Sequence, residues 1–198
     1  MNFDYNEEQQ LLADSVRRYL QKDYDFEARR KILASPEGWS ERVWSTFADM
    51  GLTGLPLSPD YGGFGGGAVD LMSVMEAFGE ALVVEPYLPT VLASLLISRS
   101  GDEKHKKAIL PLVAQGKMRL ALATGERGVI GAPMADRIVL VRGTEILIGK
   151  PRIVKADRTV DDLAAADIRL EDAEPVRATQ AMLDEVLDFG AALSCAEA

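Results

Sequence analysis

Histidine and cysteine are scarce in this sequence. Its 198 residues include one histidine, His105, and one cysteine, Cys195. A lone cysteine excludes an internal disulfide and fits a reducing, cytoplasmic compartment. His105 stands in the charged run 102–107 at the start of a predicted helix, so we expect a solvated surface histidine. Neither a His/Cys metal site nor a Cys–His nucleophile pair is therefore expected, and any redox chemistry would need a bound cofactor.

The sequence also lacks an excess of positive charge and long apolar runs. Its net charge of -9 gives no attraction to nucleic acid or anionic lipid, so we expect neither as a partner. No apolar run reaches the ~18–20 residues that a membrane span needs. The N-terminus has no basic-then-apolar signal, so export is not expected. The apolar and charged contents, 47% and 27%, are typical of a globular protein.

The first 116 residues predict helices. Asn6 and Gln9 form a capping-box pattern. Apolar residues follow at helical spacing: Leu11, Leu12, Val16, Tyr19 and Leu20. Residues 26–33 predict a second helix, and Ser40 predicts the start of a third, with Trp39 and Trp44 in the positions of a hydrophobic staple. Later helices are predicted after the glycine stretch, over 89–100, where nearly every face is apolar, and over 103–115.

From Lys117 the pattern changes to short aliphatic segments separated by Gly, Pro and charge. Residues 120–124, 138–141, 146–148 and 166–170 predict strands, and a last helix is predicted from about Thr179. Helices, then strands, then a helix indicate an α+β fold. We divide the chain into an N-terminal helical domain (1–116), a small β-domain (117–174) and the start of a C-terminal helical domain (175–198).

Residues 61–67, YGGFGGG, fit a loose dinucleotide-binding fingerprint. That motif needs a strand before it, but 55–60 (LPLSPD) has two prolines, which suit a central strand poorly. It also needs an acid at the end of a second strand about 20 residues on, where this chain predicts helix. We therefore interpret the stretch as a tight structural loop between helices that binds no nucleotide.

Several motifs, in order, resemble the acyl-CoA dehydrogenase family. They are Pro56 with 60–65 (DYGGFG), 74–79 (VMEAFG), 110–116 (LPLVAQG) and 120–126 (LALATGE). Segments 26–30, 35–39, 158–162 and 195–197 are similar, more narrowly, to small subunits of pimeloyl-CoA dehydrogenase. The resemblance runs from end to end of the chain, and the shared order of the motifs identifies it as a member of the family.

The resemblance implies an FAD enzyme that converts an acyl-CoA to its trans-2-enoyl-CoA. In the family, FAD lies between the β-domain and a C-terminal bundle, which carries the glutamate base. The bundle would only be starting at Ala198, so no residue here inherits the catalytic role. The β-domain is shorter than the family's, with about a strand pair fewer between Gly128 and Val129 and a second apparent shortening at Gly143-Thr144. The flavin-contacting threonine of the family falls at Gly125, next to Thr124.

The resemblance also implies binding residues. Leu122, Ala123 and Thr124 are candidates for backbone contact with FAD, although they could equally form only a sheet edge. Tyr87, Val91, Leu92 and Leu95 match the family's acyl-pocket helix, although plain helix core is the simpler interpretation. Glu76 and Glu85 are interpreted as structural hydrogen-bond or ion-pair partners, and Arg29 and Arg30 as surface charges.

Two functions stay open from the sequence. The first is the small subunit of an α2β2 acyl-CoA dehydrogenase whose large partner carries the base and holds most of the FAD, with electron-transfer flavoprotein as acceptor. The second is a non-catalytic paralogue that completes the oligomer and the partner's FAD or CoA site. The acyl group is also open. Similarity to pimeloyl-CoA subunits suggests a dicarboxylic or bulky chain, yet no basic residue can be tied to a distal carboxylate, and steroid or side-chain acyl-CoAs remain possible.

Overall fold

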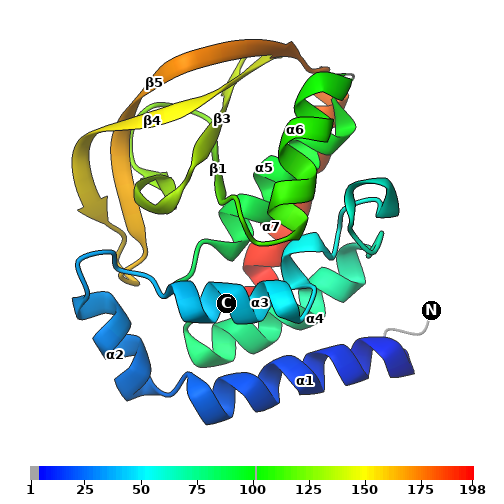
Figure 1. Ribbon diagram of the computed structural model, residues 1–198, viewed down its shortest axis with the longest axis vertical. Coiled ribbons are helices and arrows are strands. Elements are labelled where there is room, and N and C mark those ends of the chain that lie inside the picture. Colours follow the sequence, from blue (N-terminus) through cyan, green and yellow to red (C-terminus); the bar gives the residue numbers. More distant parts are fainter. Residues whose placement is uncertain (1–4, 101) are drawn as a thin grey trace.

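The computed structural model describes residues 5–100 and 102–198, and it has helices gathered around one side of a curved sheet (Figure 1). The helices are α1 (Glu7–Asp23), α2 (Phe26–Ala34), α3 (Glu41–Asp49), α4 (Ala68–Ala81), α5 (Tyr87–Arg99), α6 (Glu103–Ala114) and α7 (Gln180–Glu197). The strands are β1 (Leu120–Ala123), β2 (Val129–Ile130), β3 (Arg137–Arg142), β4 (Glu145–Arg158) and β5 (Ala164–Arg177). The predicted α+β order is confirmed.

The predicted helix starts are confirmed at their caps. Asn6 and Gln9 form the reciprocal capping box of α1, and the Ser40 hydroxyl accepts from the Val43 N–H at the start of α3. Thr179 caps α7 in the same way. One predicted apolar face is wrong at Leu11, whose side chain is 63% exposed, because α1 contacts the rest of the fold through its neighbours Val16 and Leu20.

The five strands form one mixed sheet in the order β1-β3-β4-β5-β2, in which β1 and β3 are parallel and the other pairs antiparallel. β4 and β5 are each 14 residues long, well beyond the predicted 146–148 and 166–170. From Arg152 to Arg158, β4 is exposed, so no buried apolar alternation marks it as a strand. Gly143-Thr144, interpreted as a shortening, is the two-residue turn of the β3–β4 hairpin, with Gly143 at a φ of 63°.

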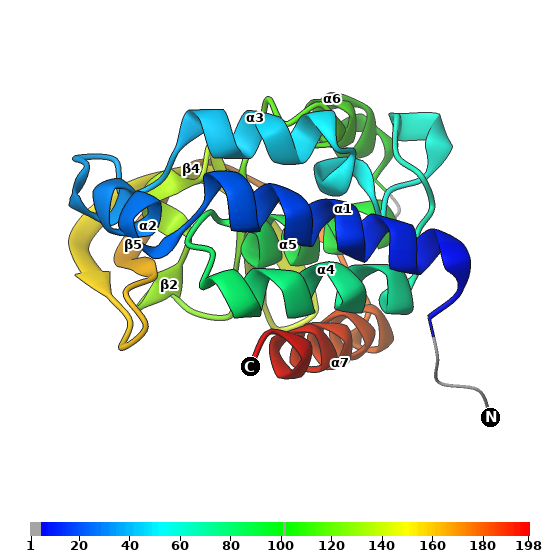
Figure 2. The same ribbon diagram turned by 90° about the horizontal axis from the view of Figure 1, so that it is seen from below.

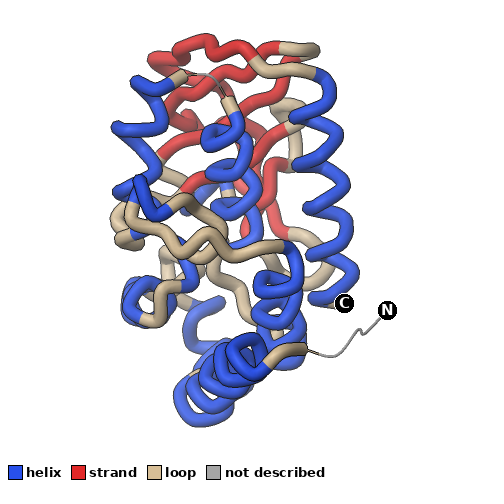
Figure 3. The backbone as a smooth tube through the Cα atoms, turned by 90° about the vertical axis from the view of Figure 1, so that its right-hand side faces the viewer, coloured by secondary structure: helices blue, strands red, loops and turns tan. Residues whose placement is uncertain are grey.

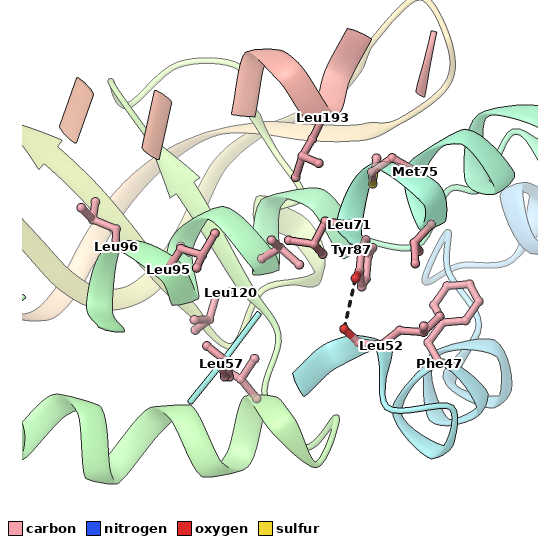
Figure 4. Packing of buried hydrophobic residues seen from close by; sticks show 14 of the residues in the cluster. Phe47, Leu52, Leu57, Leu71, Met75, Tyr87, Leu95, Leu96, Leu120 and Leu193 are labelled. Atoms are coloured by element: carbon pink, nitrogen blue, oxygen red, sulfur yellow. Dashed lines mark hydrogen bonds between the residues drawn. The ribbon is translucent and has the colours of Figure 1, made fainter. Parts of the chain in front are cut away.

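Helix α5 lies at the centre of the fold, between the sheet and the other helices (Figure 1). Figure 3 shows the strands in the upper half of the molecule, with helices on both sides of them and below. Its residues are apolar on nearly every side because α6, α7, β1 and the 3-10 turn Leu52–Gly54 contact it, and Phe78 of α4 meets the ring of Tyr87 edge-on. Leu95, Leu96 and Tyr87 pack there with Phe47 and Leu193, and the Tyr87 hydroxyl donates to the carbonyl oxygen of Leu52 at 3.1 Å (Figure 4). No helix among the described residues is long and apolar enough to cross a membrane.

The glycine stretch 61–67 is held in place by backbone hydrogen bonds to the preceding segment 54–57. The N–H groups of Phe64, Gly65 and Gly66 donate to the carbonyl oxygens of Gly54, Leu57 and Leu55, at 3.1, 2.8 and 2.7 Å. N–H groups used in this way are not available to a phosphate. The interpretation of YGGFGGG as a structural turn agrees with this geometry.

His105 is not the solvated surface residue that we expected, because it is only 9% exposed. The carboxylate of Asp102 lies 3.1 Å from its Nδ1, and that of Glu174 lies 3.5 Å from its Nε2. Glu174 belongs to the unpredicted second half of β5, which passes over the start of α6. Nothing in the charged run around His105 predicts that β5 lies over this residue.

Candidate functional site

A cavity of about 680 Å³ lies where the end of α4, the start of α5, β1 and the C-terminal turns of α7 meet. Figure 2 shows α7 running below α4 on this side of the molecule. Most of the lining side chains are apolar: Met75, Phe78, Tyr87, Leu92, Leu122 and Met134 are among them. Leu82, Ile130 and Leu187, which are 53%, 42% and 43% exposed, also belong to the lining. Its size and character are those of a small-molecule site.

The cavity brings together four of the seven predicted site residues. Tyr87 and Leu92 line it from α5, and Leu122 and Thr124 line it from β1 and the residue that follows. Val91 and Leu95 do not line the cavity: they lie in the main core, with 1% and 6% exposure, although helical spacing places them on the same side of α5 as Tyr87 and Leu92.

Ala123 lies on the other face of the sheet from Leu122. It is 3% exposed and belongs to a second, smaller core with Ile138 and Ile168. Alternation along the strand explains why Leu122 and Thr124 reach the cavity while Ala123 does not.

Strand β1 is a terminal strand of the sheet, and its outer edge faces α5. The Thr90 hydroxyl accepts from the Leu120 N–H at 3.1 Å and donates to the Leu120 carbonyl oxygen at 3.0 Å. Backbone groups two residues apart point the same way in a strand, so those of Leu122 point to this edge as well. Next to the cavity, β1 therefore offers main-chain donors and acceptors to a flat ligand.

Arg29 joins three parts of the chain at the cavity wall and is half-buried, contrary to the expected surface role. Its Nε donates to the carbonyl oxygen of Leu82 at 2.8 Å, and its Nη2 donates to that of Asp161 at 3.0 Å. It thus ties α2 to the segment after α4 and to the β4–β5 connection. Arg30, by contrast, makes a surface ion pair with Glu27 at 3.1 Å, as expected.

Glu85 is a buried acid in the cavity lining, with 5% exposure. One carboxylate oxygen accepts from the Ser40 N–H at 3.2 Å, which agrees with the predicted structural role. Burial raises the pKa of Glu85 to about 6, and hydrogen bonds from Tyr24 and from backbone N–H groups oppose this rise. Glu76 also has a structural role, because it accepts from the Tyr5 hydroxyl at 2.7 Å.

Replacing Glu85 with glutamine should change how stability depends on pH. A folded-state pKa of about 6, against an ordinary 4.5, means that the folded protein holds this proton more tightly than the unfolded chain does. The free energy of unfolding therefore falls by about 2 kcal/mol as the pH rises from 4.5 through 6. Glu85→Gln cannot ionise and keeps an acceptor for Ser40, so urea titrations should lack this fall. Glu145→Gln, at an exposed position on β4, should retain it. An unchanged pH profile in Glu85→Gln would contradict the assignment.

Several cavity residues were missed from the sequence, notably Met134, Asp161, Leu187 and Glu197. They come from the β2–β3 connection, the β4–β5 turn and α7, which the resemblance did not associate with a pocket. No group of three or more His, Cys, Asp or Glu able to hold a metal occurs within residues 5–100 and 102–198.

Helix α7 lies very close to α4 and α5. A Cβ atom on Gly79 of α4 would lie 1.9 Å from the carbonyl oxygen of Glu197. One on Gly190 of α7 would lie 2.9 Å from Leu92 Cδ1. The two glycines permit this approach, which places Leu187 and Glu197 in the cavity wall.

Comparison with known proteins finds both similar sequences and similar structures. Acyl-CoA dehydrogenase IpdE2 of Mycolicibacterium smegmatis is 27% identical over 198 residues, covering 96% of this chain and 62% of the relative. The ChsE4-ChsE5 complex from Mycobacterium tuberculosis matches with a TM-score of 0.83 and 18% identity, over 100% of this chain and 64% of that chain. PigA with FAD and proline matches with a TM-score of 0.81 and 17% identity, over 100% and 67%. The chain thus spans about three fifths of the length of IpdE2.

The family assignment follows from the helical half. Residues 6–117, more than half of the chain, match the acyl-CoA dehydrogenase N-terminal domain. The structure has the same organisation over this range, with α1 to α6 placing the predicted loop and helix motifs in one body. The protein belongs to the acyl-CoA dehydrogenase family.

Proposed function

We propose that this chain is the small subunit of a heteromeric, FAD-dependent acyl-CoA dehydrogenase that forms a trans-2-enoyl-CoA. The observation that carries the proposal is the apolar cavity beside the outer edge of β1, lined by Tyr87, Leu92, Leu122 and Thr124. The apolar lining would hold an acyl chain out of water, which strengthens polar interactions around a reacting thioester. The ChsE4-ChsE5 complex supports a partner of the same family.

The residues around β1 fit the flat ring of FAD better than its pyrophosphate. Leu122 and Thr124 would hold the ring through backbone groups, and Ile130 would cover it from β2. Among residues 5–100 and 102–198, Arg29 is the one cation in the cavity lining, and two of its N–H donors already serve carbonyl oxygens. We propose that the larger partner supplies the catalytic base and the binding site for the pyrophosphate of FAD. When bound, FAD supplies the acceptor for the hydride that leaves the acyl β-carbon.

The experiment that tests the proposal purifies the chain alone and together with a large acyl-CoA dehydrogenase subunit. Flavin absorbance and ferrocenium-coupled oxidation of acyl-CoAs are recorded for the lone chain, for the large subunit alone and for the pair. Turnover by the pair but not by the lone chain is the expected result. A pair whose large subunit turns over equally well without this chain would contradict the proposal.

The second candidate function, a non-catalytic subunit that completes the partner's site, is favoured by the shortage of free cations in the cavity lining. It predicts one FAD per two chains in the purified pair. FAD and turnover in the lone chain would exclude it.

Narrowing the cavity should separate the two candidates. Leu92→Trp adds bulk at the cavity wall, and we expect at least a roughly tenfold fall in kcat/KM of the pair, since a misplaced substrate loses catalysis steeply. Leu11→Trp, at an exposed leucine of α1, is the matched control and should leave kcat/KM within about twofold. Equal kcat/KM values in the two variants would show that the acyl group does not bind in this cavity. They would favour the non-catalytic function.

A further inference from the structure

The charged groups of the cavity are unbalanced in favour of acids. In the part of the chain that the structure describes, Glu85, Asp161 and Glu197 line it together with one cation, Arg29. They come from four separate parts of the chain: α2, the segment before α5, the β4–β5 turn and α7. An otherwise apolar cavity is thus bordered by a net negative charge.

Arg29 is poorly placed to receive a carboxylate. A guanidinium binds a carboxylate best through two parallel N–H donors on one edge. The Nε and Nη2 atoms form such an edge, and they donate to the carbonyl oxygens of Leu82 and Asp161 at 2.8 and 3.0 Å. A carboxylate competing for this edge would have to break the contacts that hold α2 to the cavity wall.

The acids are close enough to influence one another. Burial raises the pKa of Glu197, and the negative charge of Asp161 raises it further. A second carboxylate brought into this space by a ligand would meet the same repulsion.

We infer that the acyl group taken by this cavity is uncharged at its far end, and that acyl chains ending in a carboxylate are rejected. This inference rests on the proposed function and settles a choice that the sequence leaves open between dicarboxylic and neutral bulky chains. The discriminating groups are Asp161 and Glu197, which repel a distal carboxylate, and Arg29, whose Nε/Nη2 edge already donates to two carbonyl oxygens.

The test compares two ligands that differ only at the far end: octanoyl-CoA and the CoA thioester of the C8 dicarboxylic acid. Dissociation constants are measured by calorimetry on the purified subunit pair. Because the CoA moiety is common to both ligands, its contribution cancels in the ratio of their dissociation constants. We expect octanoyl-CoA to bind at least about tenfold more tightly, since a like charge ~4 Å from a carboxylate near a protein surface costs about 4 kcal/mol, more than the ~1.4 kcal/mol that corresponds to tenfold.

In the variant Asp161→Asn/Glu197→Gln, the dissociation constant of the dicarboxylic ligand divided by that of octanoyl-CoA should fall by about tenfold. The control Glu171→Gln/Asp172→Asn removes the same number of negative charges at exposed positions of β5, outside the cavity lining, and should leave the ratio unchanged. Equal binding of the two ligands, tighter binding of the dicarboxylic ligand, or equal ratios in both variants would overturn the inference while leaving the acyl site in place. Failure of both ligands to bind would overturn the proposed acyl site itself, and the inference with it.

Discussion

Replacing Phe47 with alanine should lower the free energy of unfolding by about 3–5 kcal/mol, the cost of removing a fully buried aromatic side chain. Phe47 has 0% exposure and stacks on Phe78 with ring centroids 4.7 Å apart. Tyr19 meets its ring edge-on at 6.2 Å. These contacts join α1, α3 and α4, so the cavity left by alanine would loosen three helices together. Urea titration monitored by circular dichroism measures the change.

Leu11→Ala is the control for Phe47→Ala, because Leu11 is 63% exposed on α1. It should change the free energy of unfolding by no more than about 0.5 kcal/mol. Two variants with similar losses would show that the three-helix junction around Phe47 contributes less than its burial indicates. Phe78 also lines the proposed acyl site, so Phe47→Ala should weaken acyl-CoA binding under conditions where the protein is still folded.

Replacing Gly63 with alanine should cost about 3 kcal/mol, in the upper range for forcing an extra methyl group into a packed interior. A Cβ atom at this position would lie 2.2 Å from the carbonyl oxygen of Leu57 and 2.6 Å from that of Gly54. Both are backbone atoms, so no side-chain rotation can relieve the clash. The loop would have to open and give up hydrogen bonds such as that from Phe64 N–H to Gly54.

Gly67→Ala is the control within the same loop, since its Cβ would lie 3.7 Å from the nearest atom, an oxygen of Asp70. Gly67 is the N-cap of α4, where alanine costs less than about 1 kcal/mol relative to glycine. Thermal and urea unfolding of the two variants compare the positions directly. If Gly63→Ala is no worse than Gly67→Ala, the loop is more adaptable than its close backbone contacts indicate.

The helices were predictable because their signals are local. Asn6 with Gln9, Ser40 and Thr179 each stand next to the apolar periodicity that they begin, and capping is decided within one turn of chain. The two long strands were predicted only in part, because Arg152–Arg158 of β4 is exposed and its residues carry no buried alternation. Pairing with β5, which is set by the hairpin and not by local pattern, extends them.

The predicted site residues also fall into two groups, those that line the cavity and those that do not. Tyr87, Leu92, Leu122 and Thr124 came from resemblance to a family, and the cavity brings them together. Val91, Leu95 and Ala123 came from the same motifs, yet other elements cover Val91 and Leu95 in the main core, and strand alternation turns Ala123 into the second core. A motif gives positions along a chain, whereas the face that each position presents depends on how its element is packed.

The order of helices and strands, the caps, the character of the YGGFGGG loop and the family could all be predicted from the sequence. These depend on short-range geometry and on motif order, both of which can be read along the chain. The three-dimensional arrangement was needed to show that Arg29, Asp161 and Glu197 share one cavity wall, and that Glu174 of β5 contacts His105. Such groups are far apart in sequence, and their charges interact only because packing of α2, β5 and α7 brings them within reach of one another through space.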